Sequence, residues 1–188
     1  MNYRVGIFGG MGSGKSTVLS RLQSLGASVL SADAVNAELL CRPEYMERVG
    51  ELCPACLVDG AVDKKILRTW ITQDEANRRA LMALAHPYIR DEIVRRTDIG
   101  LWFVELTVFV PDLVPLNESW HVVSAPMYRL ARVVYRGGIS IAEAEALIRA
   151  QNADGLAPAD AILFPNEGTV EDLYRLVDAR YRSLAAKF

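Results

Sequence analysis

The sequence lacks the charge pattern and the long apolar runs that would suit a nucleic-acid or membrane partner. Its 21 basic and 23 acidic residues leave a formal charge of -2 across 188 residues, and the two signs are mixed along the chain. Duplex DNA or an anionic membrane would require a basic surface, which this balance does not provide. The apolar stretch 99–110 is interrupted by Glu105 and is too short to span a bilayer. We therefore predict no nucleic-acid partner and no membrane segment.

Cysteine and histidine are scarce. Cys53 and Cys56 form a C-x-x-C pair, but no second pair or nearby histidine completes a zinc set, since the histidines are His86 and His121. The pattern therefore favours neither a metal nor a redox role for this pair. The odd third residue, Cys41, and a beginning (MNYRVGIFGG) without a signal-peptide pattern favour a reducing cytoplasm.

Short apolar strands alternate with helical segments near both ends of the chain. The predicted strands are 3–8, 28–31, 101–110, 120–124 and 161–164. The predicted helices are 15–25, 34–40, 126–135, 141–150 and 170–184. Capping patterns support two of these helices, with Ser140 and Glu143 as a capping box and Thr169 as an N-cap. Such alternation is typical of a parallel sheet in an α/β fold.

The middle of the chain, 44–96, has helical spacing of apolar residues and no convincing strand, which indicates a helical insertion. Asp63 is expected to cap a helix that begins at Lys64, and Pro87 is expected to kink or restart a longer one. We therefore expect a core of 1–43 and 99–188 around an inserted subdomain of 44–98.

The segment GGMGSGKS, residues 9–16, satisfies the pattern G-x-x-x-x-G-K-[ST] between a predicted strand and a predicted helix. In such a P-loop, successive backbone N–H groups wrap phosphates at a helix N-terminus, the lysine reaches the outer phosphates and the hydroxyl can hold Mg²⁺. The sequence therefore predicts binding of a nucleoside triphosphate, ATP in the first place, with Ser16 as the metal-binding residue. The loop residues expected to contact it are Gly10, Met11, Gly12, Ser13, Gly14, Lys15, Ser16 and Thr17.

Two further features suit a small-molecule kinase. Asp33 follows the second predicted strand, at the edge of a parallel sheet where ligands bind, so its carboxylate could face an acceptor hydroxyl. It could equally serve as a helix N-cap. The predicted hairpin 126–150, within a lid of about 126–158, carries Arg129, Arg132, Arg136 and Arg149. Arg132 and Arg136 are four residues apart on one helix face, which suits a cationic lid or a solvated basic surface.

These features together resemble the dephospho-CoA kinase family over nearly the whole chain. The loop GGMGSGKST is similar to the family's GGIGSGKS, and SVLSAD to its strand ending in D-A-D. The segment AHPYI is similar to its H-P-x-I. Further matches are the R-x-x-x-R of Arg132 and Arg136, the helix-ending Gln151, and Asn166 in an N-x-G pattern.

The resemblance implies a P-loop NTPase fold with three α/β/α layers, a parallel sheet, a helical insertion and a helical lid. It implies ATP as phosphoryl donor, with Mg²⁺, and dephospho-CoA as the small-molecule acceptor. Lys15, Asp33 and Arg136 are then expected to be catalytic, and Arg132 and Asn166 to contact the nucleotide. The insertion becomes the CoA-binding subdomain.

Within that subdomain, the resemblance assigns acceptor binding to His86 and Pro87, together with Asp33. Taken alone, a His-Pro pair is more often a helix kink. The sequence departs from the family at Ser31, in place of the first Asp of D-A-D, and at 105–109, where P-L-L-x-E is replaced by ELTVF. It also has Asp154 where the lid loop is usually basic. Two alternatives therefore remain: a kinase for another hydroxyl acceptor or nucleoside monophosphate, and a nucleotide-binding protein without activity.

Overall fold

The computed structural model of the protein describes residues 2–107, 110–152 and 157–188. The chain divides into two compact units, one of Met1–Ser31 with Thr97–Phe188 and one of Ala32–Arg96. The first unit contains a parallel sheet with its helices, and the second is mainly helical. No helix within the described residues is both long and apolar enough to cross a lipid bilayer.

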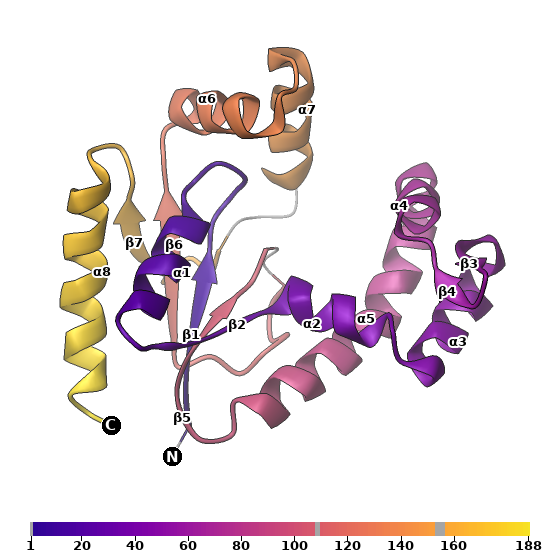
Figure 1. The fold of residues 1–188 in the computed structure, drawn as a ribbon, viewed down its shortest axis with the longest axis horizontal. Helices are drawn as coiled ribbons and strands as arrows, with labels where there is room; N and C mark the ends of the chain where they lie inside the picture. The colour runs from indigo at the N-terminus through magenta and orange to yellow at the C-terminus, as the bar shows by residue number, and fades with distance from the viewer. Residues whose placement is uncertain (1, 108–109, 153–156) are drawn as a thin grey trace. The chain divides into compact units, whose positions relative to one another are not determined.

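The sheet of the first unit confirms the predicted α/β class. Its strands, in the order β2-β5-β1-β6-β7, are all parallel (Figure 1). Their bounds are Asn2–Phe8 (β1), Ser28–Ser31 (β2), Gly100–Glu105 (β5), Glu118–Val123 (β6) and Ile162–Pro165 (β7). The strand predicted at 101–110 is thus shorter than expected. It ends at Glu105, which pairs with Ile7 on one side and Ser31 on the other, where both neighbouring strands are also ending.

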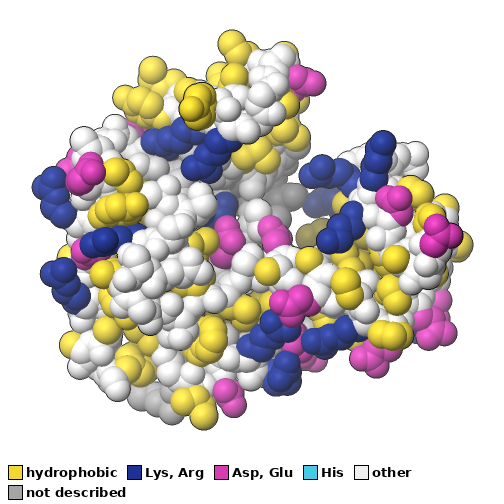
Figure 2. Space-filling model, in the orientation of Figure 1, with side chains coloured by type: hydrophobic (Ala, Val, Ile, Leu, Met, Phe, Trp, Pro, Cys, Tyr) yellow, Lys and Arg dark blue, Asp and Glu magenta, His cyan; other side chains and the backbone are white. Residues whose placement is uncertain are grey.

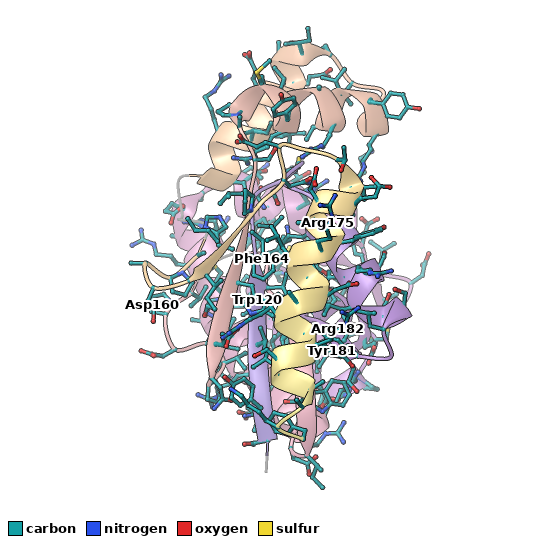
Figure 3. The ribbon with its side chains drawn as sticks, turned by 90° about the vertical axis from the view of Figure 1, so that its left-hand side faces the viewer. Trp120, Asp160, Phe164, Arg175, Tyr181 and Arg182 are labelled. Carbon is teal, nitrogen blue, oxygen red and sulfur yellow. A yellow bond between two sulfur atoms is a disulfide. The ribbon has the colours of Figure 1, made fainter. Side chains whose placement is uncertain are left out.

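One face of this sheet is covered by α1 (Lys15–Ser24) and α8 (Val170–Ala185). Figure 3 shows α8 running along the sheet beside Trp120 and Phe164, whose stacked rings have centroids 4.5 Å apart. Arg21 on α1 joins Asp178 on α8 through two hydrogen bonds of 2.7 and 2.6 Å. Thr169 and Asp172 form a capping box at the start of α8, so the predicted cap is confirmed.

A helical hairpin of α6 (Pro126–Gly137) and α7 (Ile141–Asn152) follows β6. Gly138 ends α6 with a left-handed φ of 57°, and the predicted capping box of Ser140 and Glu143 starts α7. Figure 2 shows hydrophobic side chains at the surface of this hairpin. Those exposed in it are Met127, Tyr128, Tyr135, Ile141 and Leu147.

The second unit contains α2 (Ala32–Leu39), α3 (Pro43–Leu52), α4 (Lys64–Gln73) and α5 (Glu75–Arg96). Asp63 caps α4 as predicted, accepting hydrogen bonds from the N–H groups of Lys65 and Ile66. One expectation for this segment is wrong, because a short antiparallel hairpin of β3 (Leu57–Val58) and β4 (Ala61–Val62) interrupts the helices. Of the two outcomes expected at Pro87, a kink or a restart, the restart does not occur, because α5 runs through Pro87.

Packing explains why α5 continues. Tyr88, next to Pro87, makes an edge-to-face ring contact with buried Tyr45 of α3, with centroids 4.9 Å apart. Such tertiary contacts can offset the hydrogen bond that proline removes from a helix. Before β3, Cys53 and Cys56 are joined by a disulfide across a 3-10 turn (Pro54–Cys56). The sequence pattern had not favoured any role for this pair.

The second unit begins at Ala32 rather than at the expected 44, because ion pairs and packing tie α2 and the start of α3 to α5. Buried Glu92 of α5 accepts from Arg42 at 2.8 Å, from Arg95 at 2.6 Å and from Arg96 at 2.8 Å. Arg96 also pairs with Glu38 of α2. These hydrogen bonds, led by those from Arg95 and Arg42, hold the pKa of Glu92 well below its usual range.

We expect Glu92→Gln to lower the free energy of unfolding at pH 7 by about 1–3 kcal/mol, because three guanidinium groups would then face a neutral amide. Since the folded-state pKa is depressed, the stabilisation is complete above the unfolded pKa of about 4.3 and declines as the pH falls below it. Urea unfolding of both proteins between neutral and acidic pH measures this. The exposed pair of Arg48 and Glu51 supplies the control, Glu51→Gln, with an expected change within about 0.5 kcal/mol. If Glu92→Gln lowered the free energy of unfolding by the same amount at neutral and acidic pH, the stabilisation could not come from the ionised Glu92 carboxylate.

Candidate nucleotide-binding site

The site is built where β1 ends at Phe8 and the chain turns through residues 9–14 into α1. The loop can take this path because several of its residues lack a side chain, and two of them show the reason clearly. Gly12 and Gly14 have φ angles of 76° and 107°. A Cβ atom at Gly12 would lie 2.5 Å from the carbonyl oxygen of Arg129, and one at Gly14 would lie 2.2 Å from Nδ2 of Asn166.

Lys15 and Ser16, the residues expected to act on the phosphates and on Mg²⁺, open α1. The ammonium group of Lys15 donates to the carbonyl of Gly9 at 2.7 Å, which holds it across the loop. Ser16 is exposed, and its Oγ accepts from Nη1 of Arg136 at 3.3 Å. Lys15 is thus held on the loop at the start of the helix, and Arg136 is joined to the neighbouring Ser16.

Ser13 supplies a test of whether the loop suits phosphate. Its Oγ is buried, and it has no hydrogen-bond partner within the described residues. Leaving such a group unpaired costs about 1–3 kcal/mol, so a binding site can account for it. Together with a helix N-terminus and a lysine, this hydroxyl fits a loop that receives phosphate oxygens.

Arg132 and Asn166, the other two residues expected at the nucleotide, hold the outer side of the loop. Arg132 donates through Nη1 to the carbonyl of Gly12 and to Oγ of Ser124, both at 3.1 Å, and through Nη2 to the carbonyl of Asn166 at 3.0 Å. Asn166 donates through Nδ2 to the carbonyl of Ser13 at 2.7 Å. Both side chains therefore bind the loop's carbonyl groups.

Three residues contribute here in ways that the sequence did not predict: Arg129 was expected only as a cation of the lid, and Gln151 and His121 had no assigned role. Arg129 is buried and donates through Nε to the carbonyl of Met11 at 2.9 Å. Gln151 accepts from the N–H of Met11 and donates to the carbonyl of Thr107 at 3.3 Å. Arg129 and Arg132 are three residues apart on one helix, and this spacing could have suggested that Arg129 lies at the same site as Arg132.

The third is His121, on β6 opposite Phe8. Burial in the first place, and then the charges of Arg129 and Lys15, lower the pKa of this histidine. The neutral form of the imidazole is therefore favoured beside the loop. In the sequence, His121 lies in an apolar strand, and a histidine in such a place more often belongs to a hydrophobic core than to a binding site.

The residues expected to bind the acceptor lie in the second unit. Asp33 is exposed in the first turn of α2, two positions after β2 ends. Because α2 begins at Ala32, Asp33 is inside the helix and the N-cap alternative is wrong. His86 and Pro87 lie in α5, where burial lowers the pKa of His86. A pocket of about 230 Å³ in this unit is lined by Pro87 together with Arg42, Arg95 and others.

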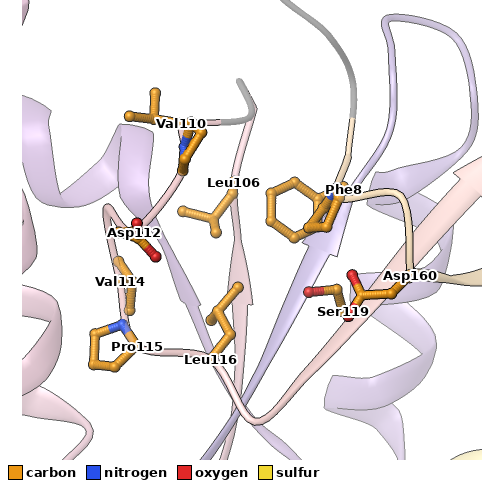
Figure 4. A pocket seen from close by; sticks show the side chains of 11 residues that line it. Phe8, Leu106, Val110, Asp112, Val114, Pro115, Leu116, Ser119 and Asp160 are labelled. Atoms are coloured by element: carbon orange, nitrogen blue, oxygen red, sulfur yellow. The ribbon is translucent and has the colours of Figure 1, made fainter.

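The first unit holds a larger cavity of about 460 Å³ on the sheet face that bears Phe8 (Figure 4). Phe8, Leu106 and Val114 form apolar walls, and Ser119 and Asp160 add polar groups. Phe109 and Asp154, two positions of departure from the family pattern, lie outside the described residues.

Fold and site together define a P-loop α/β protein. The sequence profile of the dephospho-CoA kinase family matches residues 3–172. The chain belongs to the dephospho-CoA kinase family, as the resemblance predicted.

Relatives and solved structures agree over almost the full length. The dephospho-CoA kinase of Thermus thermophilus is 33% identical over 187 residues, covering 93% of this chain and 88% of that protein. That of Wolinella succinogenes is 28% identical over 197 residues, covering 100% and 98%. The crystal structure of TT1252 from Thermus thermophilus superposes with a TM-score of 0.80 at 31% identity, covering 97% of this chain and 98% of that one. The dephospho-CoA kinase from Campylobacter jejuni, with a TM-score of 0.61 at 20% identity and 96% of both chains covered, shares the fold.

The close approaches at Gly14 give a direct test of the loop. We expect Gly14→Ala to weaken ATP binding at least about tenfold, because the new Cβ collides with Asn166 and the left-handed φ disfavours alanine. Isothermal titration with ATP measures this. Gly26→Ala is the matched control, since Gly26 has a similar φ of 82° with open space around it. Its ATP affinity should stay within twofold of the wild-type value; an equal loss in both variants would refute the steric argument.

Proposed function

We propose that this protein is an ATP-dependent kinase that phosphorylates the ribose 3′-hydroxyl of dephospho-CoA, giving coenzyme A and ADP. The observation that carries the proposal is the tethered P-loop, with Lys15 bound to the Gly9 carbonyl and Arg136 bound to Ser16, in a chain of the dephospho-CoA kinase family. An ATP-consuming step of this kind also suits the cytoplasm, where we propose that the protein acts.

On the donor side, the loop and its cations would neutralise the phosphates. Lys15 and Arg136 each bring a positive charge to the start of α1, where the backbone N–H groups of the helix also point. Phosphoryl transfer is catalysed mainly by positioning and by stabilising charge on the transferring group, which these residues would do. We assign Lys15 to contact the transferring phosphate and Arg136 to contact the same phosphate from the opposite side.

The metal would be held by few protein atoms. Mg²⁺ in kinases is bound chiefly by substrate phosphates and water with one or two protein ligands, and the exposed Oγ of Ser16 fits that need. When bound, the ion neutralises charge between the outer phosphates. Arg136, which donates to the same Oγ, would orient the hydroxyl.

On the acceptor side, we propose that Asp33 accepts a hydrogen bond from the ribose 3′-hydroxyl and takes its proton as the new P–O bond forms. Its place two residues beyond the carboxyl end of β2 supports this, since open parallel sheets bind ligands at that edge. We propose the helical unit as the acceptor-binding domain, with His86 and Pro87 contributing. The pocket beside Pro87 is lined by Arg42 and Arg95 and also by Asp91 and Glu92, so its formal charges balance.

A second acceptor remains a specific alternative, because Ser31 and the segment beginning at Glu105 depart from the family pattern. Both positions lie at the carboxyl edge of the sheet, since Ser31 pairs with Glu105. A change there could alter which hydroxyl compound is accepted while sparing ATP binding.

The test is ADP release by the purified protein given ATP, Mg²⁺ and a panel of acceptors that includes dephospho-CoA, adenosine, AMP and gluconate. We expect turnover with dephospho-CoA and a product with one added phosphate. A Lys15→Met protein should be inactive, which excludes a contaminating kinase. Confirmed ATP binding without turnover on any acceptor would overturn the proposal, and turnover on another acceptor alone would favour the alternative.

Asp33→Asn tests the acceptor side. We expect the rate of phosphoryl transfer to fall about 100-fold to 10,000-fold, because the amide cannot take the proton, while ATP affinity stays within about twofold. Single-turnover kinetics and ATP titration measure the two quantities. Glu44→Gln removes another exposed carboxylate from the first turn of a helix in the same unit, and should leave both unchanged. A near-normal rate in Asp33→Asn would show that this carboxylate does not assist transfer.

A further inference from the structure

Both helices of the hairpin hold the backbone of one P-loop residue, Met11. Arg129 of α6 donates to its carbonyl at 2.9 Å, and Gln151 near the end of α7 accepts from its N–H. The residues are 118 and 140 positions away in sequence from Met11. The peptide groups on either side of Met11 are therefore fixed by side chains from two different helices.

Arg129 fits closely against this loop. It is 7% exposed, and its Nη2 would lie 2.2 Å from a Cβ atom at Gly10. Its own backbone carbonyl lies against Gly12. The guanidinium therefore occupies space that only a glycine-rich loop leaves open, and it brings a buried positive charge close to the phosphate site.

The side-chain amide of Gln151 acts both as an acceptor and as a donor. Oε1 accepts from Met11, and Nε2 donates to the carbonyl of Thr107 at 3.3 Å, two residues beyond the end of β5. A carboxylate of the same size could only accept, so it would face the Thr107 carbonyl with repulsion. Gln151 thus joins the P-loop to the segment that leaves β5.

We propose that Arg129 and Gln151 are positioning residues that act as one clamp on Met11 and hold the P-loop in the conformation that binds the triphosphate. Neither residue is assigned to the phosphoryl transfer itself. The clamp couples the α6–α7 hairpin to the loop, since displacement of either helix would release one of the two Met11 peptide groups. The inference rests on the proposed nucleotide binding and not on the identity of the acceptor.

The experiment is isothermal titration of the full chain with ATP in the absence of any acceptor, using Arg129→Met, Gln151→Met and the double variant. Each single change should weaken ATP binding about threefold to tenfold, the effect of one lost hydrogen bond. Because both side chains hold the backbone of the same residue, Met11, the double variant should bind about as weakly as the worse single variant, and the two losses should not multiply. Arg175→Met and Gln23→Met are matched controls at exposed positions of α8 and α1, expected within twofold of wild type.

A second pair of changes separates the clamp from a general loss of structure. Gln151→Glu keeps the size of the side chain but removes the donor and adds negative charge, so it should bind ATP more weakly than Gln151→Met. Arg129→Lys keeps the charge and should recover part of the affinity lost in Arg129→Met. Gln151 is only half-buried, so its variants test the clamp even where the Arg129 variants do not fold.

In turnover assays with whichever acceptor is active, the clamp variants should raise the KM for ATP and leave the KM for the acceptor unchanged. ATP affinities within twofold of wild type for both single variants would overturn the clamp, as would losses that multiply in the double variant. Because ATP binding is measured without acceptor, these results are independent of whether dephospho-CoA is the substrate.

Discussion

The close approach of the glycine-rich loop to α6 and to Asn166 is the constraint on which the rest of the nucleotide site depends. At Gly12 and Gly14 a single additional carbon would collide with its neighbours. That approach lets side chains from α6 and from the turn after β7 reach loop carbonyls over distances near 3 Å. The parallel sheet contributes by ending β1 and β6 next to each other, so that the loop and the start of the hairpin emerge at the same edge.

The parts of the fold that could be predicted from sequence are those set by local chemistry. The strand before Gly9 and the helix after Gly14 follow from apolar spacing and the glycine pattern, and Asp63, Ser140 and Thr169 cap helices as their side chains predict. Each of these features depends on residues only a few positions apart, where propensity and hydrogen bonding act without help from the rest of the chain.

The parts that could not be predicted depend on contacts between distant segments. Pro87 was expected to kink or restart its helix, and the restart does not occur, because packing around neighbouring Tyr88 allows α5 to continue. The start of the second unit at Ala32 depends on pairs such as Arg96 with Glu38, which no local pattern indicates. The same holds at the site, where Arg129 and Gln151 reach Met11 from more than a hundred residues away. The family resemblance supplied Arg132 and Asn166 at the nucleotide site but gave no role to Arg129.

Four carbonyl oxygens of the loop, those of Gly9, Met11, Gly12 and Ser13, each accept a hydrogen bond from a side chain. The donors are Lys15, Arg129, Arg132 and Asn166, of which three are cationic. The oxygen ends of these four peptide groups, which carry partial negative charge, therefore face side-chain donors and not a bound anion. A side chain that could only accept hydrogen bonds would be excluded from all four donor positions. The constraint on the sequence thus extends from the eight residues of the motif to the side chains that bind its carbonyl groups, which a search for the motif alone would overlook.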